Sequence, residues 1–282
     1  MIAALAEAVG RELGHRPAES GCAHNTAPGV RERRGPHRTG PHGFAGCGCV
    51  TDPRAGLGAG TPVADAVPPV RTAFVDVLGP SPAEVLRDLT ATAATPNPVP
   101  AVVVPAFLAS GYHVYQDVPR EVADSGHPAV MVTPAMGPDP ALARIMAMRL
   151  RAAGWRPGDA VVFAAAGSSD PRARADVRRA AAMLTAQLAT PVRTAYVATG
   201  APRVPDVVAQ LRARGRQRVF VASYLLAHGL FHERLHQAGA TGVADPIGVH
   251  PAVVRLIADR YRAAGLGRSA LPHPTETAIP RA

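Results

Sequence analysis

Short apolar runs alternate along the second part of the chain with segments whose apolar residues recur every three to four positions. The runs predict strands at Ala160–Ala165, Arg193–Val197, Arg218–Ser223 and Gly242–Asp245. The helical spacing predicts helices at Ala173–Leu188, Val204–Ala213, His232–Gln237 and Ala252–Ala263. Strands that alternate with helices in this way are typical of a parallel sheet flanked by helices, the α/β class.

The first part of the chain shows the same alternation of apolar runs and helically spaced segments. Strands are predicted at Val70–Val77, Ala101–Pro105 and Ala129–Thr133. Helices are predicted at Ile2–Leu13, Pro82–Thr90, Pro119–Asp124 and Pro140–Ala153.

An internal repeat relates the two parts. The segment PVRTAFV at Pro69–Val75 returns as PVRTAYV at Pro191–Val197. VVVPAFLASGYH at Val102–His113 aligns with VFVASYLLAHGL at Val219–Leu230, and Gly137–Gly154 aligns with Gly248–Gly265. The sequence therefore predicts two tandem copies of one α/β domain, at 1–154 and 155–265, followed by a flexible tail at 266–282.

The first copy lacks a counterpart of the strand and turn VVFAAAGSSDP at Val161–Pro171. The first strand of a doubly wound sheet is central, so its loss leaves neighbouring strands without backbone partners. We therefore expect that the natural reading frame begins upstream of Met1. The alternative is a chain in which another segment fills the position of the strand.

An insertion at 14–68 separates the first helix from the rest of its copy. It is dense in Gly, Pro, Arg and His and lacks apolar periodicity, so we expect it to be disordered. It also carries His24, His37, His42, Cys22, Cys47 and Cys49. Their spacing matches no closed zinc site, which favours a solvated loop and leaves loose metal loading as the alternative.

Net charge and hydropathy argue against several classes of binding partner. The formal net charge is +9 and all 30 basic residues are arginines, so the lysine of an ATP-binding P-loop is absent. No nucleic-acid motif accompanies the charge, whereas an anionic small molecule suits it. No apolar run reaches the roughly 18 residues of a membrane span, and the start is unlike a signal peptide. We expect a cytoplasmic protein without ATP, organic cofactor, nucleic acid or membrane partner. The sequence does not determine its oligomeric state.

The most informative loop follows the strand at Ala101–Pro105 and contains Ser110, Gly111, Tyr112 and His113. Ligand sites in open parallel sheets lie beyond the carboxyl ends of the strands. A neutral imidazole there can bind a divalent metal or accept a proton near neutral pH. The alternative is a loop histidine bonded to a nearby carbonyl group.

Three other groups are weaker candidates. Ser168 and Ser169 lie in a strand-to-helix turn whose amides could hold a carboxylate or a phosphate, although Ser and Asp there are more often a helix cap. His228 and His232 are four residues apart, but no third metal ligand is evident and Gly229 favours a loop. His250, before Pro251, is expected to have a local structural role.

Four segments carry a family resemblance: FVDVLGPSP (Phe74–Pro82), PAFLASGYHV (Pro105–Val114), VTPAMGPDP (Val132–Pro140) and AAAGSSDPRA (Ala164–Ala173). They resemble the sirohydrochlorin cobaltochelatases and ferrochelatases, the class II, ATP-independent tetrapyrrole chelatases, in a two-repeat form. The resemblance implies two α/β domains that face each other across a cleft in which the tetrapyrrole binds.

The resemblance also implies site residues. His113 matches the histidine of the family's Gly-x-His loop, and Asp76 matches a position where relatives often carry an acid, so both are expected in catalysis and metal binding. Ser110, Gly111, Tyr112, Ser168 and Ser169 would contact the tetrapyrrole. The family's other histidine, in a His-Gly-Ser/Thr turn, belongs to the missing strand, and the second copy has Ala166 there.

The implied activity is that of a lyase inserting Co2+ or Fe2+ into sirohydrochlorin, on the way to cobalamin or sirohaem. The alternative is a non-catalytic tetrapyrrole or metal carrier that kept the fold after losing the first-strand histidine. The repeat alignment pairs His113 with Leu230 and Asp76 with Ala198, so one site is expected, in the first half.

Overall fold

The computed structural model describes residues 1–14, 68–76, 78–91 and 100–268, which all belong to one compact unit. The insertion predicted at 14–68 lies outside the described residues except at its edges, as does the tail beyond residue 268.

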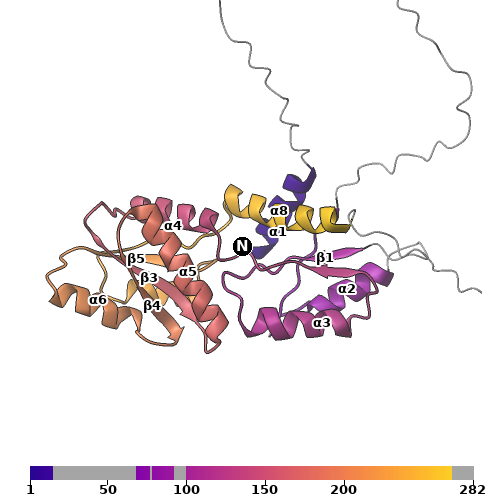
Figure 1. Ribbon diagram of the computed structural model, residues 1–282, viewed down its shortest axis with the longest axis horizontal. Helices are drawn as coiled ribbons and strands as arrows, with labels where there is room; N and C mark the ends of the chain where they lie inside the picture. Colours follow the sequence, from indigo (N-terminus) through magenta and orange to yellow (C-terminus); the bar gives the residue numbers. More distant parts are fainter. Residues whose placement is uncertain (15–67, 77, 92–99, 269–282) are drawn as a thin grey trace, which may run out of the picture. The chain divides into compact units, whose positions relative to one another are not determined.

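A parallel sheet of order β4-β3-β5-β6 forms the second half (Figure 1). Its strands are β3 (Ala160–Gly167), β4 (Val192–Thr199), β5 (Val219–Tyr224) and β6 (Gly242–Val243). All four predicted strands are confirmed, although β6 is shorter than predicted. Every residue of β5 is buried, as expected of an inner strand that helices cover on both faces.

Alternate residues of the central strand β3 face two separate apolar cores. Val161 and Phe163 pack with α4 (Pro140–Ala152) and α5 (Pro171–Leu188). Val162 and Ala164 pack on the opposite side with α6 (Val204–Ala213) and α7 (Leu230–His236). The two-residue period of a strand thus buries both faces of the sheet.

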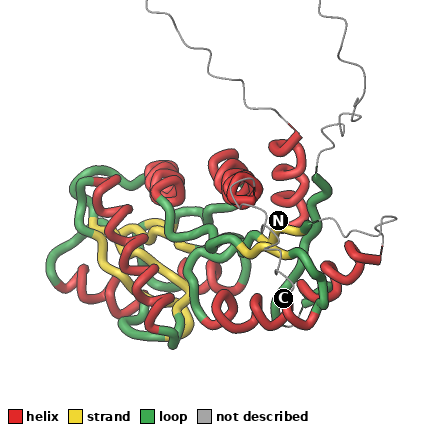
Figure 2. Tube along the Cα trace, turned by 45° about the vertical axis from the view of Figure 1, so that its right-hand side comes forward, coloured by secondary structure: helices red, strands yellow, loops and turns green. Residues whose placement is uncertain are grey.

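The first half contains a two-stranded parallel sheet in its described part, β1 (Ala101–Val103) with β2 (Val130–Val132). Its helices are α1 (Ile2–Gly14), α2 (Pro82–Ala91) and α3 (Val118–Asp124), and a π-helical turn, η1 (His113–Asp117), leads into α3. Figure 2 shows these strands in yellow and the helices in red. The predicted helices and these two strands are confirmed.

The strand predicted at Val70–Val77 is wrong, because residues 68–76 form no strand. Their counterpart β4 pairs with β3, and the described part of the first half contains no equivalent of β3. The backbone turn that follows this segment nevertheless forms in both halves. Phe74 N donates to Pro80 O at 2.8 Å, as Tyr196 N donates to Pro202 O at 2.9 Å in the second half.

The backbone hydrogen bonds correct the repeat alignment by one residue. Thr133 N donates to Val103 O, and Ala244 N donates equivalently to Val221 O, each at 2.9 Å. In the loops that follow, Tyr115 N donates to Gly111 O and Glu233 N donates to Gly229 O. Gly111 therefore corresponds to Gly229, and His113 corresponds to Phe231 rather than to Leu230.

The helix that ends each copy packs on the other copy. In Figure 1, α8 (Pro251–Arg268) lies beside α1, and Arg262 of α8 donates to the Glu12 carbonyl of α1 at 3.0 Å. Helix α8 also contacts β1, whereas α4, from the first copy, packs on α5 and β5. Each half of the protein is therefore completed by a segment of the other copy.

Candidate functional site

Residues of the second copy hold the loop that follows β1. Tyr224 of β5 donates its hydroxyl to the Leu108 carbonyl at 2.6 Å, and the Ser110 amide donates to Asp176 Oδ2 of α5 at 2.8 Å. Burial raises the pKa of Tyr224, and the negative charges of Asp176 and Asp139 raise it further. The phenol therefore stays protonated and keeps its role as donor.

The same loop meets the turn that follows β3. A Cβ added at Gly111 would lie 3.2 Å from the Ala173 Cβ and 3.6 Å from Ser168 Oγ, so a larger residue would be crowded there. The structure therefore brings Gly111 and Ser168, both predicted site residues, close together across the two copies.

His113 lies at the start of η1 with a side chain that is 47% exposed. Its Nδ1 is 2.7 Å from Oδ2 of the buried Asp117. An ionised carboxylate can only accept, so Nδ1–H donates, and in the neutral imidazole the lone pair belongs to Nε2. Asp117 Oδ1 also pairs with Arg120 at 2.9 Å. The alternative of a carbonyl partner for His113 does not hold, since its partner is a carboxylate.

The His113 ring packs against two aromatic rings, those of Phe107 and Tyr112. Its ring stacks on Phe107, with centroids 5.9 Å apart and planes inclined by 14°. Tyr112 and Tyr115 are exposed at 58% and 45%, and the Arg172 guanidinium lies 4.0 Å from the centre of the Tyr115 ring. The loop and η1 thus carry exposed aromatic rings, and one of these rings meets a guanidinium of α5.

Asp76 and His113 are not brought into contact. Both belong to the described part of the chain, yet neither a hydrogen bond nor an ion pair joins them. Asp76 is exposed and has a φ of 84°, a left-handed conformation that aspartate tolerates better than most side chains. The carboxylate that does hold His113 is Asp117, which sequence reasoning missed. Its four-residue spacing from His113 was the available signal, since residues so spaced share one face of a helical turn.

The predicted Ser168–Ser169 turn forms a helix cap. Ser168 Oγ accepts from the Asp170 amide at 3.0 Å, and Asp170 caps α5 by accepting from the Arg172 amide at 2.8 Å. The hydrogen bond from the Arg172 side chain lowers the pKa of Asp170. Ser169 is exposed in the same turn. The structure thus agrees with the capping alternative while leaving Ser168 beside the His113 loop.

The second-half histidines have different surroundings. His250 Nδ1 accepts from the Ala252 amide at 3.1 Å at the start of α8, which is the local role predicted for it. His228 and His232 lie together, and the structure adds an acidic neighbour, Asp245, that the sequence did not reveal.

These observations define a class of protein. It is a tandem α/β protein whose candidate site is a carboxylate-supported histidine at the carboxyl edge of a parallel sheet, bordered by exposed aromatic rings. The sequence model of the family named CbiX matches residues 60–153 and 160–264, so the chain belongs to the CbiX family and both of its repeats are included. This confirms the resemblance to the sirohydrochlorin chelatases, and the protein is a member of a metal-chelatase family.

Solved structures share the fold. SirB from Bacillus subtilis with Fe3+ is 22% identical, with a TM-score of 0.62 over 72% of this chain and 85% of that one. The sirohydrochlorin chelatase SirB from Bacillus subtilis subspecies spizizenii in complex with cobalt is 22% identical, with a TM-score of 0.55 over 70% of this chain and 81% of that one. No curated protein sequence matches the chain. In the part of the chain that the structure describes, no helix has the length and apolar character to cross a bilayer.

Proposed function

We propose that this protein inserts a divalent metal ion, Co2+ or Fe2+, into sirohydrochlorin without ATP. The observation that carries the proposal is the arrangement of His113 in a chain of the CbiX family. Asp117 occupies Nδ1 of His113, and Nε2 faces no protein partner among the described residues.

The chemistry required is the exchange of two protons for one metal ion. A dication that enters the macrocycle displaces the two pyrrole N–H protons, and a base must accept them. Nε2 of His113 can accept a proton or bind the arriving ion, and the Asp117 carboxylate stabilises the imidazolium that forms on protonation. Asp117 therefore fixes the ring through Nδ1 and leaves Nε2 as the nitrogen available to a proton or a metal ion.

The surface around His113 suits a flat, anionic macrocycle. The rings of Tyr112 and Tyr115 offer faces for stacking, and Arg172 offers a guanidinium for a rim carboxylate. The other proposed contacts lie in the same loop, at Ser110 and Gly111, and in the adjoining turn, at Ser168 and Ser169. Asp76 remains a proposed supporting acid that would favour the approach of the dication.

The choice of metal stays open between cobalt and iron, because both accept nitrogen and oxygen ligands and selectivity follows geometry and supply. The corresponding pathway is that of cobalamin for cobalt or of sirohaem for iron. We also propose that the reaction takes place in the cytoplasm.

The test is anaerobic incubation of the purified full chain with sirohydrochlorin and each metal, followed by the absorption change of the macrocycle. We expect insertion by the unmodified protein and none by His113→Ala. The matched control is His236→Ala, which removes an exposed histidine of α7 and is expected to leave insertion intact. A protein that binds the tetrapyrrole or the metal but gives no insertion would be a carrier, and the proposal would be wrong.

A further inference from the structure

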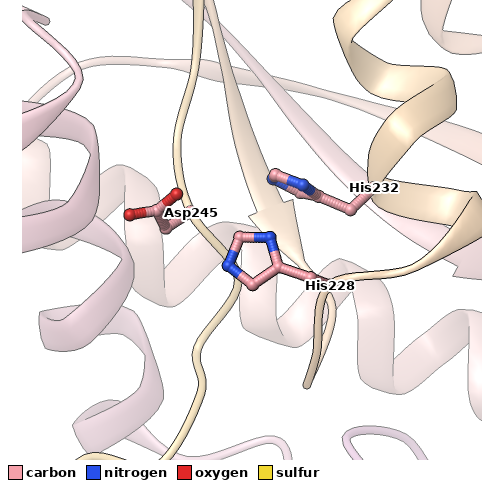
Figure 3. A group of neighbouring side chains, drawn as sticks. All are labelled: His228, His232 and Asp245. Carbon is pink, nitrogen blue, oxygen red and sulfur yellow. The ribbon is translucent and has the colours of Figure 1, made fainter.

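A second cluster of metal-ligating side chains lies in the second half. One ligand atom each from His228, His232 and Asp245 lie within 4.8 Å of one another. Figure 3 shows the two imidazoles, on the loop and helix that follow β5, with the Asp245 carboxylate on a neighbouring segment of chain. Within the described ranges this is the one group of three or more His, Cys, Asp or Glu residues with such geometry.

The topology explains why these residues meet. His228 follows β5, His232 lies in the first turn of α7, and Asp245 follows β6. Strands β5 and β6 are parallel neighbours, so their carboxyl ends fall at the same edge of the sheet. The cluster therefore occupies the kind of position at which open α/β sheets bind ligands.

A hydrogen bond fixes the tautomer of His232. It is 4% exposed, and its Nε2 lies 3.1 Å from the Ala244 carbonyl oxygen. A carbonyl can only accept, so Nε2–H donates and the lone pair belongs to Nδ1. Histidines that bind metals usually donate their other ring nitrogen in this way, which fixes the tautomer and the ring plane.

The other two side chains leave the cluster open to solvent. His228 and Asp245 are exposed, and the His228 ring meets the His232 ring edge to face, with centroids 4.8 Å apart. An ion could enter from water and keep water molecules as further ligands.

Arg149 and His236 are described neighbours of the cluster. Arg149 NH1 is 4.0 Å from Asp245 Oδ2, the limit of an ion pair, and leaves Oδ1 of that carboxylate without a cation. The His236 ring packs against His232, with centroids 4.9 Å apart. A divalent ion would thus meet the Arg149 guanidinium, which weakens binding but does not block it.

We propose that His228, His232 and Asp245 bind a divalent transition-metal ion at a site separate from His113. Two imidazole nitrogens and one carboxylate oxygen suit Zn2+, Co2+, Fe2+ or Ni2+ better than Ca2+ or Mg2+, which prefer oxygen ligands. The inference does not rest on the proposed insertion reaction, because its three residues belong to the second copy alone.

The experiment is Co2+ titration of the full chain after removal of bound metal, followed by calorimetry and visible absorption. The background carries His113→Ala and serine at Cys22, Cys47 and Cys49, so that the other candidate ligands named in the sequence are reduced. Asp245→Asn is the main variant, because it changes one exposed oxygen to an amide and should not disturb folding. His228→Gln is the second variant, and His236→Gln is the matched control.

We expect Asp245→Asn and His228→Gln each to weaken one Co2+ equivalent by about tenfold or more, or to abolish it, and His236→Gln to leave it unchanged. Co2+ should also raise the melting temperature of the background protein and have a smaller effect on the two variants. Unchanged stoichiometry and affinity in Asp245→Asn, with the apo protein folded as judged by its melting curve, would overturn the proposal.

Discussion

The pairing of His113 with Asp117 has a measurable consequence at the scale of single residues. Asp117→Asn keeps an acceptor oxygen near Nδ1 but removes the charge that stabilises an imidazolium. We expect metal insertion to slow by roughly 10- to 100-fold, the usual effect of losing such a support, with the KM for the tetrapyrrole little changed. Steady-state kinetics of the purified variant checks this.

The control for that variant is Asp124→Asn, the same chemical change at an exposed position at the end of α3. It should leave kcat near that of the unmodified protein. A loss of kcat of similar size in both variants, or a loss in Asp117→Asn matched by a lower melting temperature, would mean that Asp117 acts through folding and not by positioning His113.

A pH effect on stability is expected from His250. Burial lowers the pKa of His250 from 6.5, and the charges of Arg149 and Arg255 add to this. The unfolded chain therefore takes up the proton first as the pH falls, so the contribution of neutral His250 is complete above pH 6.5 and is lost as the pH falls through the lower folded pKa. Protonation of Nδ1 also removes the acceptor of the Ala252 amide.

His250→Asn tests this, because asparagine can accept the same helix-capping bond but does not titrate. Urea unfolding at about pH 7.5 and about pH 5.5 should show a larger loss of unfolding free energy in the unmodified protein than in the variant. Equal losses in the two proteins would assign the acid sensitivity to other groups.

The sequence indicates some residues of the two sites and not others. Asp117 is four positions from His113, so a local helical pattern was enough to indicate it. Asp245 is far along the chain from His228 and follows a different strand, so its proximity depends on β6 pairing with β5. A third ligand of that kind becomes visible only when the strand order is known.

At the scale of elements, α5 anchors the loop that carries His113. The buried Asp176 accepts from the Ser110 amide and pairs with Arg179. Asp176→Ala would leave that amide without its partner, at a cost of about 1–3 kcal/mol in unfolding free energy, and would loosen the loop. We expect slower metal insertion as well as lower stability.

The comparison for Asp176→Ala is Asp170→Ala, which removes the cap of the same helix at a cost of about 1 kcal/mol. Both variants weaken α5, but Asp176 accepts from the loop amide, whereas Asp170 accepts from the Arg172 side chain. Denaturant unfolding and insertion rates together separate the effects. If the two variants lose activity in proportion to their stability, the Asp176–Ser110 hydrogen bond has no special role in the site.

Most elements were predictable because their signal is local. The period of apolar residues located the helices and the six paired strands β1 to β6, for example α6 at Val204–Ala213 without any shift of its ends. The segment at 68–76 has nearly the same sequence as β4 and yet forms no strand. Strand formation requires a neighbour, and β4 has β3 beside it whereas the first-half segment has no described equivalent.

At the scale of the whole molecule, the exchange of α4 and α8 was not predictable from the repeats. The apolar face of each helix indicates that the helix packs against another element. It does not identify that element. The structure pairs α8 with α1 and β1, and α4 with α5 and β5. The proposed boundary between 154 and 155 thus separates two sequence copies, while the packing joins them.

The two halves are expected to be chemically unequal, and the corrected register sharpens the test. His113 corresponds to Phe231, and Asp117 corresponds by the same register to Leu235, which is 1% exposed. Phenylalanine can neither bind a metal nor accept a proton, so one insertion site per chain is expected. Phe231→Ala should therefore leave insertion unaffected, in contrast to His113→Ala.

A rescue experiment tests this prediction more strictly, and we expect it to restore no insertion. Phe231→His in the His113→Ala background restores a histidine at the equivalent loop position, but the residue four positions later is the buried Leu235 and offers no carboxylate. Without that support the ring is neither oriented nor stabilised as an imidazolium, so we expect no insertion. Recovery of the absorption change on incubation with sirohydrochlorin and Co2+ or Fe2+ would mean that a histidine alone suffices, and that Asp117 does not distinguish the halves.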